Sequence, residues 1–285
     1  MKTPKRIQPL IDDGIVDEVL RPLMSGKEAS VYVVRCGEEI RCAKVYKEAA
    51  QRSFKQAVLY QEGRKVRNSR RARAMEKGSK FGRKQQEDAW HNAEVDALYR
   101  LAKAGVRVPQ PYGCFDGVLL MELVTDEQGG VAPRLNDVSM SAEQALEDHA
   151  VVMHYVKLML CAGLVHGDLS EFNVLVDEYG PVIIDLPQAV DAAGNNNARS
   201  MLARDINNMT EYYGQYAPEL LQTRYADEIW ALYEEGELNE DTELTGLFED
   251  SGEAADVDAV LMEIKAVMAE EAERRERIRE ANEED

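Results

Sequence analysis

The sequence lacks the features that mark secreted and membrane proteins. It has no apolar run approaching the ~20 residues of a membrane-spanning helix, and its first six residues lead into no hydrophobic secretory segment. Cysteine is scarce: the four residues form no C-x-x-C pair and have no histidine beside them at metal-ligand spacing. We therefore expect a cytoplasmic protein without membrane contact, whose cysteines are reduced and mostly buried.

The sequence also has too few basic residues for bulk nucleic-acid binding, since 34 Lys and Arg stand against 53 Asp and Glu in 285 residues. The bases are concentrated in one place. Residues 51–84 hold twelve of them against two acids, whereas residues 234–285 hold twenty acids against five bases. The basic segment has little apolar content, which predicts a flexible stretch. It either holds a polyanion, such as RNA or a ribosomal particle, or is attracted to the protein's own acidic surface.

Hydrophobic patterning divides the chain into a strand-rich first half and a helical second half, an α+β arrangement. The expected strands cover 31–34, 42–46, a pair ending with 118–124, 174–176 and 182–184. The expected helices cover 14–21, 87–104, 143–162, a stretch from about 199 and an amphipathic helix from about 253. We expect an N-lobe of residues 1–123, a hinge of residues 124–136, a C-lobe of residues 137–250 and an acidic amphipathic C-terminal helix of residues 251–285.

Three features of the first half favour a phosphate-bearing ligand. Ser25-Gly26-Lys27-Glu28-Ala29 precedes a strand, and small residues let backbone amides approach phosphate oxygens, although most such loops are ordinary turns. Lys44 lies within an apolar strand, where its ammonium either reaches solvent or answers an anion. Glu94 lies on the following helix, either as a surface residue or as the partner that fixes Lys44 toward phosphates.

The second half contains a cluster of polar residues between two apolar runs, in LVHGDLSEFNVLV at residues 164–176. Asp168 and Asn173 lie five residues apart on the expected loop, and Asp185 ends the strand VIID. Oxygen ligands on a loop and a strand end suit Mg²⁺, which takes few protein ligands and keeps waters or phosphate oxygens. The simpler interpretation is a capped helix-to-strand loop, with Asp185 as a strand cap.

The motifs SGKEASVY, HGDLSEFNVLV and IIDLPQAV occur together, and this combination resembles the RIO family of atypical protein serine/threonine kinases, in particular its type-one branch. The resemblance covers about residues 20–225 and implies a bilobal protein-kinase-like fold. Gly167 replaces the Arg of the ordinary H-R-D motif, and Leu186-Pro187 replaces the Phe-Gly of D-F-G. No A-P-E motif follows, so we expect neither a full activation segment nor the usual peptide-binding subdomains.

The resemblance implies a role for each motif residue. Asp168 would accept the proton of the substrate hydroxyl. Asp185 would hold Mg²⁺ together with Asn173, and in the family it can itself accept phosphate. His166 is expected to pack as a structural residue that braces the catalytic loop, and Asp205 either anchors the amides of that loop or lies on the surface of its helix. The nucleotide-binding residues implied by the family are Ser25, Gly26, Lys27, Lys44, Glu94, Glu122 and Val124, the last two through backbone groups that face the adenine.

Three functions remain in competition. The first is an ATP- and Mg²⁺-dependent protein serine/threonine kinase, with Mn²⁺ able to replace Mg²⁺ and autophosphorylation expected at Ser53, Ser69 or Ser79. The second is an ATPase switch that acts as a ribosome-assembly factor, which the basic segment 51–84 favours. The third is a small-molecule phosphotransferase of the aminoglycoside or choline kind. That class shares H-G-D-x-x-x-x-N, but the Ser-Gly-Lys-Glu loop and the basic insertion speak against it.

Overall fold

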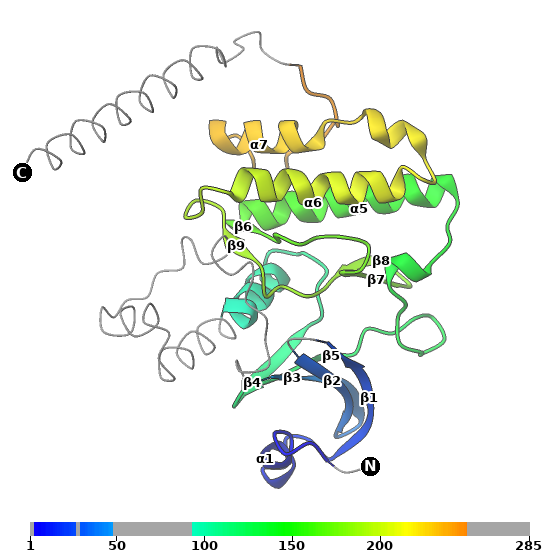
Figure 1. The fold of residues 1–285 in the computed structure, drawn as a ribbon, viewed down its shortest axis with the longest axis vertical. Coiled ribbons are helices and arrows are strands. Elements are labelled where there is room, and N and C mark those ends of the chain that lie inside the picture. The colour runs from blue at the N-terminus through cyan, green and yellow to red at the C-terminus, as the bar shows by residue number, and fades with distance from the viewer. Residues whose placement is uncertain (1–2, 27–28, 48–92, 250–285) are drawn as a thin grey trace, which may run out of the picture. The chain divides into compact units, whose positions relative to one another are not determined.

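The computed structural model describes residues 3–26, 29–47 and 93–249, which are drawn in colour in Figure 1. The helices and strands reported below all belong to one unit, Met1–Gly246. Several predicted features lie outside the described residues, namely Lys27, the basic segment 51–84 with Ser53, Ser69 and Ser79, the beginning of the helix predicted at 87–104, and the C-terminal helix 251–285.

The first part of the unit is a five-stranded antiparallel sheet in the order β1-β2-β3-β5-β4. The β2–β3 hairpin forms as predicted, because Gly37 supplies the positive φ of 64° that its tight turn requires. The register pairs Val31 with Lys44, so Lys44 lies on the central strand. The strands are β1 Glu18–Ser25, β2 Ala29–Cys36, β3 Glu39–Tyr46, β4 Pro111–Phe115 and β5 Val118–Glu122.

The prediction of a helix at residues 14–21 is wrong. The helix near this end is α1, Gln8–Asp12, and strand β1 begins four residues later than the predicted helix. Pro22 lacks the N–H that a continuing helix needs, and Val19 lies opposite Val34 of β2. The segment is too short for its apolar spacing to distinguish a helix from a strand. Pairing with the neighbouring strand therefore decides its structure.

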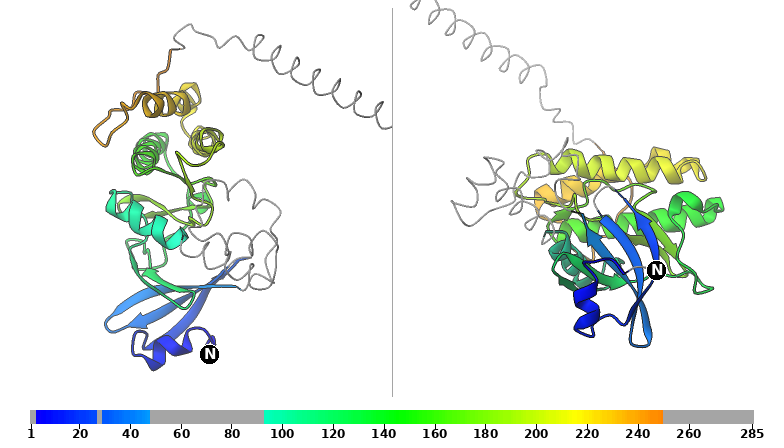
Figure 2. Two further views of the ribbon diagram at one scale, coloured as in Figure 1. Left: turned by 90° about the vertical axis from the view of Figure 1, so that its left-hand side faces the viewer. Right: turned by 60° about the horizontal axis from the view of Figure 1, so that its bottom comes forward.

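The second part is mainly helical, and its helices α5, α6 and α7 pack against one another in sequence (Figures 1 and 2). Ser141 is the N-cap residue of α5, and its hydroxyl accepts a hydrogen bond from the Gln144 N–H. Two short antiparallel pairs, β6 with β9 and β7 with β8, lie between these helices and the sheet (Figure 1). The bounds are η2 Leu135–Asp137, α5 Ala142–Cys161, β6 Leu164–Val165, β7 Val174–Asp177, β8 Gly180–Ile183, β9 Val190–Asp191, α6 Ala198–Tyr213, η3 Pro218–Gln222 and α7 Tyr225–Glu235.

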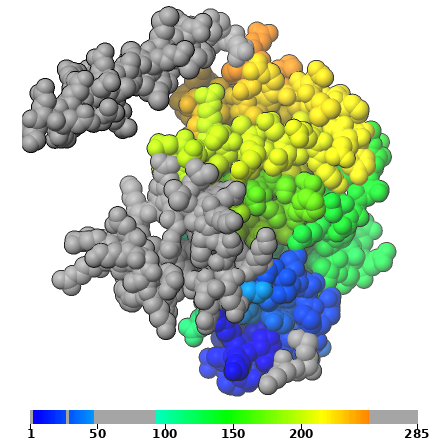
Figure 3. Space-filling model, viewed as in Figure 1, coloured from blue at the N-terminus to red at the C-terminus, as the bar shows by residue number. Residues whose placement is uncertain are grey.

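A continuous apolar core joins the two parts. The helix of residues 93–103 buries Leu98 and Leu101 in the same cluster as Tyr46 of the sheet and Leu160 of α5. In the space-filling view, strands β1 to β3 (blue) adjoin the part of the chain that follows the sheet (green) on the face shown in Figure 3. The helical part is therefore packed onto the sheet, in a bilobal, kinase-like arrangement.

The cysteines test one further prediction. All four cysteines are free thiols as expected, but only Cys42 is buried, so the prediction of mostly buried thiols is wrong. Among the described residues, no helix combines the length and the apolar character that a membrane crossing requires.

Candidate active site

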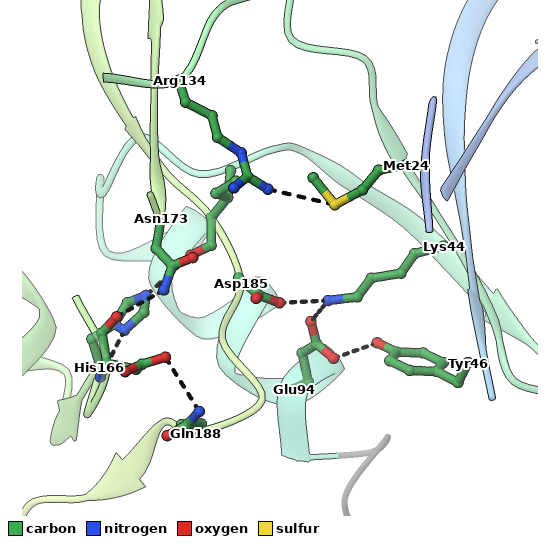
Figure 4. A network of polar contacts seen from close by, with 11 residues as sticks. Met24, Lys44, Tyr46, Glu94, Arg134, His166, Asn173, Asp185 and Gln188 are labelled. Carbon is green, nitrogen blue, oxygen red and sulfur yellow. Dashed lines mark hydrogen bonds and ion pairs between the residues drawn. The ribbon is translucent and has the colours of Figure 1, made fainter. Parts of the chain in front are cut away.

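The centre of the site is a buried ion pair that joins the sheet to the helix of residues 93–103. Lys44 Nζ lies 2.5 Å from Glu94 Oε1 and 2.9 Å from Asp185 Oδ1. The other oxygen of Glu94 accepts a 2.7 Å hydrogen bond from the Tyr46 hydroxyl. The Lys44–Glu94 pair expected from the sequence is present, and the Lys44 ammonium also reaches Asp185 across the site (Figure 4).

The charges of this cluster keep one another ionised. Burial alone would lower the pKa of the Lys44 ammonium, but the carboxylates of Glu94 and Asp185 outweigh burial and raise it. Burial alone would raise the pKa of Asp185, but the nearby Lys44 outweighs burial and lowers it. At neutral pH the site therefore holds an ammonium beside an ionised carboxylate.

The loop between β6 and β7 carries the residues of the H-G-D motif. Asn173 Nδ2 donates to the Asp168 carbonyl oxygen at 2.8 Å, which keeps Asn173 Oδ1 available as a ligand. The Asp168 carboxylate accepts a 3.2 Å hydrogen bond from Gln188 Nε2. His166 Nε2 lies 3.1 Å from the Ile184 carbonyl oxygen, and His166 Nδ1 accepts from the Asp168 N–H at 3.3 Å. His166 thus braces the loop as expected.

A buried carboxylate of α6 anchors the same loop. Asp205 accepts hydrogen bonds from the N–H groups of Gly167 at 2.7 Å and Leu169 at 3.0 Å, on either side of Asp168. Gly167 has a φ of 80°, which favours glycine. Asp205 is 1% exposed, and burial raises its pKa to about 6, against the opposing effects of His166 and the two backbone donors. Asp205 therefore has the anchoring position predicted for it.

Asp185 and Asn173 present oxygen atoms that fit a divalent cation. Asp185 has a φ of 66°, a left-handed conformation that is uncommon for a residue with a side chain and is often found at functional sites. Its side chain is 49% exposed and lines the same cavity as Asn173. Among the described residues, no group of three or more His, Cys, Asp or Glu could hold a metal. One carboxylate and one amide oxygen beside open space suit Mg²⁺, which takes few protein ligands.

These residues border a cavity of about 570 Å³ between the sheet and the helical part. This volume falls within the range of small-molecule sites. Val124 lines the cavity, and its N–H has no hydrogen-bond partner among the described residues, while its C=O accepts from the Ala132 N–H at 3.0 Å. A free N–H at an apolar wall fits the edge of a planar heterocyclic base. The apolar wall comprises Val31, Met121, Ala132, Leu175 and Ile184.

The Glu122 carboxylate is engaged by an ion-pair network that we call the Arg107 bridge. Arg107 donates two hydrogen bonds to Glu122, at 2.9 and 2.8 Å, and a third to Asp177 at 2.8 Å. Glu122 ends β5 and Asp177 ends β7, so the bridge joins the sheet to the β7–β8 hairpin. With its carboxylate held by Arg107, Glu122 could meet a base only through its backbone, as the resemblance implies.

Ser25 and Gly26 of the predicted phosphate loop are among the residues that the structure describes. The Ser25 and Ser30 hydroxyl oxygens lie 3.1 Å apart, and the Gly26 N–H bonds to the Ala29 carbonyl at 2.9 Å. Lys47 adds a cation that the sequence analysis did not identify: its Nζ donates to the Gly26 carbonyl at 2.5 Å. Gly26 lines the cavity, so the described part of the loop borders the site.

A family model described as "RIO domain" matches residues 30–226. The chain belongs to the RIO family. It is 36% identical over 210 residues to "RIO-type serine/threonine-protein kinase Rio1" of Haloferax volcanii. That alignment covers 73% of this chain and 67% of the Haloferax volcanii protein.

Eukaryotic RIO relatives are similar over the same region. "Serine/threonine-protein kinase RIO1" of Chaetomium thermophilum is 31% identical over 230 residues, and the human protein of that name is 29% identical over 217 residues. Each alignment covers 75% of this chain but only 43% and 36% of the respective relative. The chain therefore spans less than half the length of these two RIO relatives.

The RIO fold of this chain accounts for the departures from ordinary kinase motifs. α6 begins at Ala198, thirteen residues after Asp185, and β9 occupies part of that interval. This interval is too short for a full activation segment. The RIO chain therefore lacks the segment whose phosphate the missing Arg, here Gly167, would receive.

Tyr46 and Gln188 are further site residues that the sequence analysis did not identify. Tyr46 lies two residues after Lys44 on β3, so strand alternation puts both on one face, and that period could have indicated its contact with Glu94. Gln188 gave no comparable signal, because its contact with Asp168 depends on an irregular turn after β8.

Proposed function

We propose that this chain is an ATP- and Mg²⁺-dependent protein serine/threonine kinase of the RIO type. One observation carries the proposal: Lys44, Asp168, Asn173 and Asp185 all line a single cavity of about 570 Å³. The 2.9 Å contact between Lys44 and Asp185 supports it, because a phosphate chain bound there would lie between a cation and the metal-holding carboxylate. The names of the RIO relatives point to the same activity.

The proposed chemistry is transfer of the γ-phosphoryl group of ATP to a serine or threonine hydroxyl. The hydroxyl oxygen bonds to the γ-phosphorus as the bond to the β-phosphate oxygen breaks, ADP leaves, and Asp168 accepts the hydroxyl proton. Lys44, fixed by Glu94, binds the α- and β-phosphates. Asp185 and Asn173 would hold Mg²⁺, or Mn²⁺ in its place, and the metal would neutralise charge on the phosphates.

The nucleotide base belongs at the hinge, residues 124–136, in this proposal. The unpaired Val124 N–H supports this position, since it can donate to a ring nitrogen of adenine. The Glu122 carbonyl would accept from the adenine amino group, and Ser25, Gly26 and Lys27 would cover the phosphates from the first lobe. The hinge then divides an N-lobe of residues 1–123 from a C-lobe of residues 137–250.

The test is to find where the phosphate goes. The full chain is incubated with Mg²⁺ and ATP labelled at the γ-phosphate, with and without a general kinase substrate such as casein. We expect acid-stable label on serine or threonine of the chain or of casein, and no label when Asp168 is replaced by Asn. Label found only as free phosphate or only as an acyl phosphate on Asp185 would contradict the kinase proposal and favour the ATPase switch. Label on a small-molecule acceptor would favour the third class.

Autophosphorylation is a finer part of the proposal, with Ser53, Ser69 and Ser79 as acceptors. Their place in a basic segment supports it, because positive charge nearby stabilises a new phosphate. A chain with all three replaced by Ala should incorporate much less label, while casein phosphorylation stays unchanged. Undiminished self-labelling would place the acceptor elsewhere.

RNA or ribosomal-particle contact through residues 51–84 is supported by the segment's charge alone. If the segment makes about 6–10 phosphate contacts, RNA affinity should fall about 10³–10⁵-fold between 50 and 200 mM salt. A variant with residues 51–84 replaced by a Gly-Ser linker is the matched control. Salt-independent RNA binding, or equal binding by that variant, would remove this proposal and leave the kinase proposal intact.

A further inference from the structure

Arg134 is a cation in the nucleotide cavity that no motif assigns. It lies in the proposed hinge of residues 124–136, is the N-cap residue of η2, and its backbone pairs with Leu175 of β7. From there its side chain extends toward β1, where Nη2 lies 3.4 Å from Met24 Sδ (Figure 4). Arg134, Met24 and Leu175 all line the cavity.

The guanidinium of Arg134 has a poor partner. A thioether sulfur is a weak hydrogen-bond acceptor, and Arg presents five N–H donors. In the part of the chain that the structure describes, no carboxylate lies within ion-pair distance of Arg134. Arg107, in contrast, meets two carboxylates at 2.8 Å. A half-buried guanidinium whose hydrogen-bond partner is a thioether would be stabilised by an anion. The described residues do not provide that anion.

The position of Arg134 indicates where that anion lies. Arg134 lines the same cavity as Lys44 and Asp185. Lys44 approaches the same region from β3, whereas Arg134 approaches from η2 and β7 (Figure 4). The two cations therefore face one space from different walls of the cavity, beside the residues that fit a divalent cation.

We propose that Arg134 binds the phosphate chain of the nucleotide, as a second cation that complements Lys44. The proposal rests on the proposed kinase function. The guanidinium exchanges its contact with Met24 for phosphate oxygens, which it can hold with two parallel N–H donors. Because Met24 belongs to β1, this exchange releases the contact between Arg134 and the sheet when the phosphate chain binds.

The experiment measures nucleotide binding by titration calorimetry on the full chain in Mg²⁺, with MgATP, MgADP and adenosine as ligands. For Arg134→Gln we expect the affinity for MgATP and MgADP to fall about tenfold, the effect of losing one charge-assisted contact, while adenosine affinity changes less than about twofold. Arg134→Lys should recover part of the loss, because it keeps the charge without the planar fork. Arg35→Gln is the matched control, since Arg35 pairs with Glu18 on the exposed sheet and does not line the cavity.

Three results would overturn the inference. Unchanged MgATP affinity in Arg134→Gln would show that Arg134 does not contact phosphate, and a raised KM for casein alone would assign it to the protein substrate. An equal loss for adenosine and MgATP would show a structural role. Failure of the parent chain to bind MgATP at all is a separate outcome, because it contradicts the proposed function itself.

Discussion

The surroundings of Asp168 fit the role of proton acceptor that we propose for it. Burial raises the pKa of its carboxyl, the His166 and Arg204 charges oppose that effect, and Gln188 donates to one of its oxygens. Its backbone is held on both sides by Asp205. The carboxylate is therefore fixed in place while its basicity is increased, which favours a general base.

Replacing Asp168 by Asn should lower the single-turnover rate of phosphoryl transfer by roughly 10²–10⁴, because the amide cannot accept the hydroxyl proton. MgATP affinity measured by calorimetry should stay within about twofold, since the amide oxygen can still accept from Gln188. Glu178→Gln, at an exposed turn residue between β7 and β8, is the control and should match the parent. An Asn variant that transfers phosphate at the parent rate would exclude Asp168 as the base.

Tyr46→Phe should destabilise the fold, because it removes the partner of a buried Glu94 oxygen while leaving the ring in place. The expected loss is about 1–3 kcal/mol in the free energy of unfolding, measured by urea denaturation. Tyr112→Phe, at an exposed residue of β4, is the control and should cost less than about 0.5 kcal/mol. Equal stability of the two variants would mean that the Tyr46 hydroxyl contributes nothing to holding Glu94.

Asp205 gives the activity a specific pH dependence. Its pKa of about 6 lies above the value of about 3.9 for an unfolded chain, so the folded state binds the proton more tightly. As pH falls through 6, Asp205 becomes protonated and loses one of its two acceptor functions for the catalytic-loop amides, and kcat/KM should fall. The unfolding free energy should not fall with it, because protonation relieves the cost of a buried charge.

The measurement compares initial rates with thermal unfolding between pH 7.5 and 5. We expect activity to decline while the contribution of Asp205 to stability increases toward low pH, since that contribution is fully present only below the unfolded-state pKa. A rate that stays constant down to pH 5 would contradict the anchoring role of an ionised Asp205.

At the scale of elements, the Arg107 bridge fixes the sheet to the β7–β8 hairpin. Asp177 is 4% exposed and Arg107 is 29% exposed at their side chains, so these charges are only partly screened by water. Burial alone would raise the pKa of Glu122, but hydrogen bonds from Arg107 and the Gln110 N–H lower it. The bridge therefore favours the ionised carboxylate and holds the end of β5 in position.

Replacing Arg107 by Gln should cost about 1.5–3 kcal/mol in unfolding free energy at pH 7, because two carboxylates lose charge-assisted hydrogen bonds. The folded-state pKa of Glu122 is lowered, so its contribution is present above the unfolded-state value of about 4.3 and is lost as pH falls through the folded-state value. The difference between parent and variant should accordingly diminish at acid pH.

Arg35→Gln is the comparison for this measurement, since its pair with Glu18 is exposed on both sides. An exposed pair contributes about 0–1 kcal/mol. Similar losses in the two variants would mean that the Arg107 bridge behaves as an ordinary surface pair.

Elements with a long or sharply marked pattern were predictable from the sequence, and contacts across the fold were not. The α5 helix and the β2–β3 hairpin follow from periodicity and from Gly37, and the H-G-D loop follows from its motif. β1 was missed because its apolar spacing is too short to separate strand from helix. The Asp177–Arg107 contact joins residues seventy positions apart, and Arg134 meets Met24 across 110 positions, so no local pattern could indicate either.

For the whole molecule, nucleotide binding and folding should be linked. MgATP at about one hundred times its dissociation constant should add about 2.7 kcal/mol to the unfolding free energy. For a domain of this size that corresponds to a rise in Tm of roughly 5–10 °C. EDTA should remove most of the rise, and Asp185→Asn should show little dependence on Mg²⁺, because in the proposed site Asp185 would supply the carboxylate that holds the metal. A rise that is the same with and without EDTA would contradict a metal-dependent site.

The short connection between Asp185 and α6 restricts how an inhibitor could bind to this site. Leu186 is 2% exposed, and Val190 already pairs with Val165, so the metal loop is held in place within five residues. Some kinase inhibitors bind by displacing the corresponding loop outward. In this chain such a displacement would have to break the packing of Leu186 and the pairing of Val190. Selective ligands should instead occupy the cavity beside the hinge and contact Arg134. An acidic group on such a ligand would take the position proposed for a phosphate of the nucleotide.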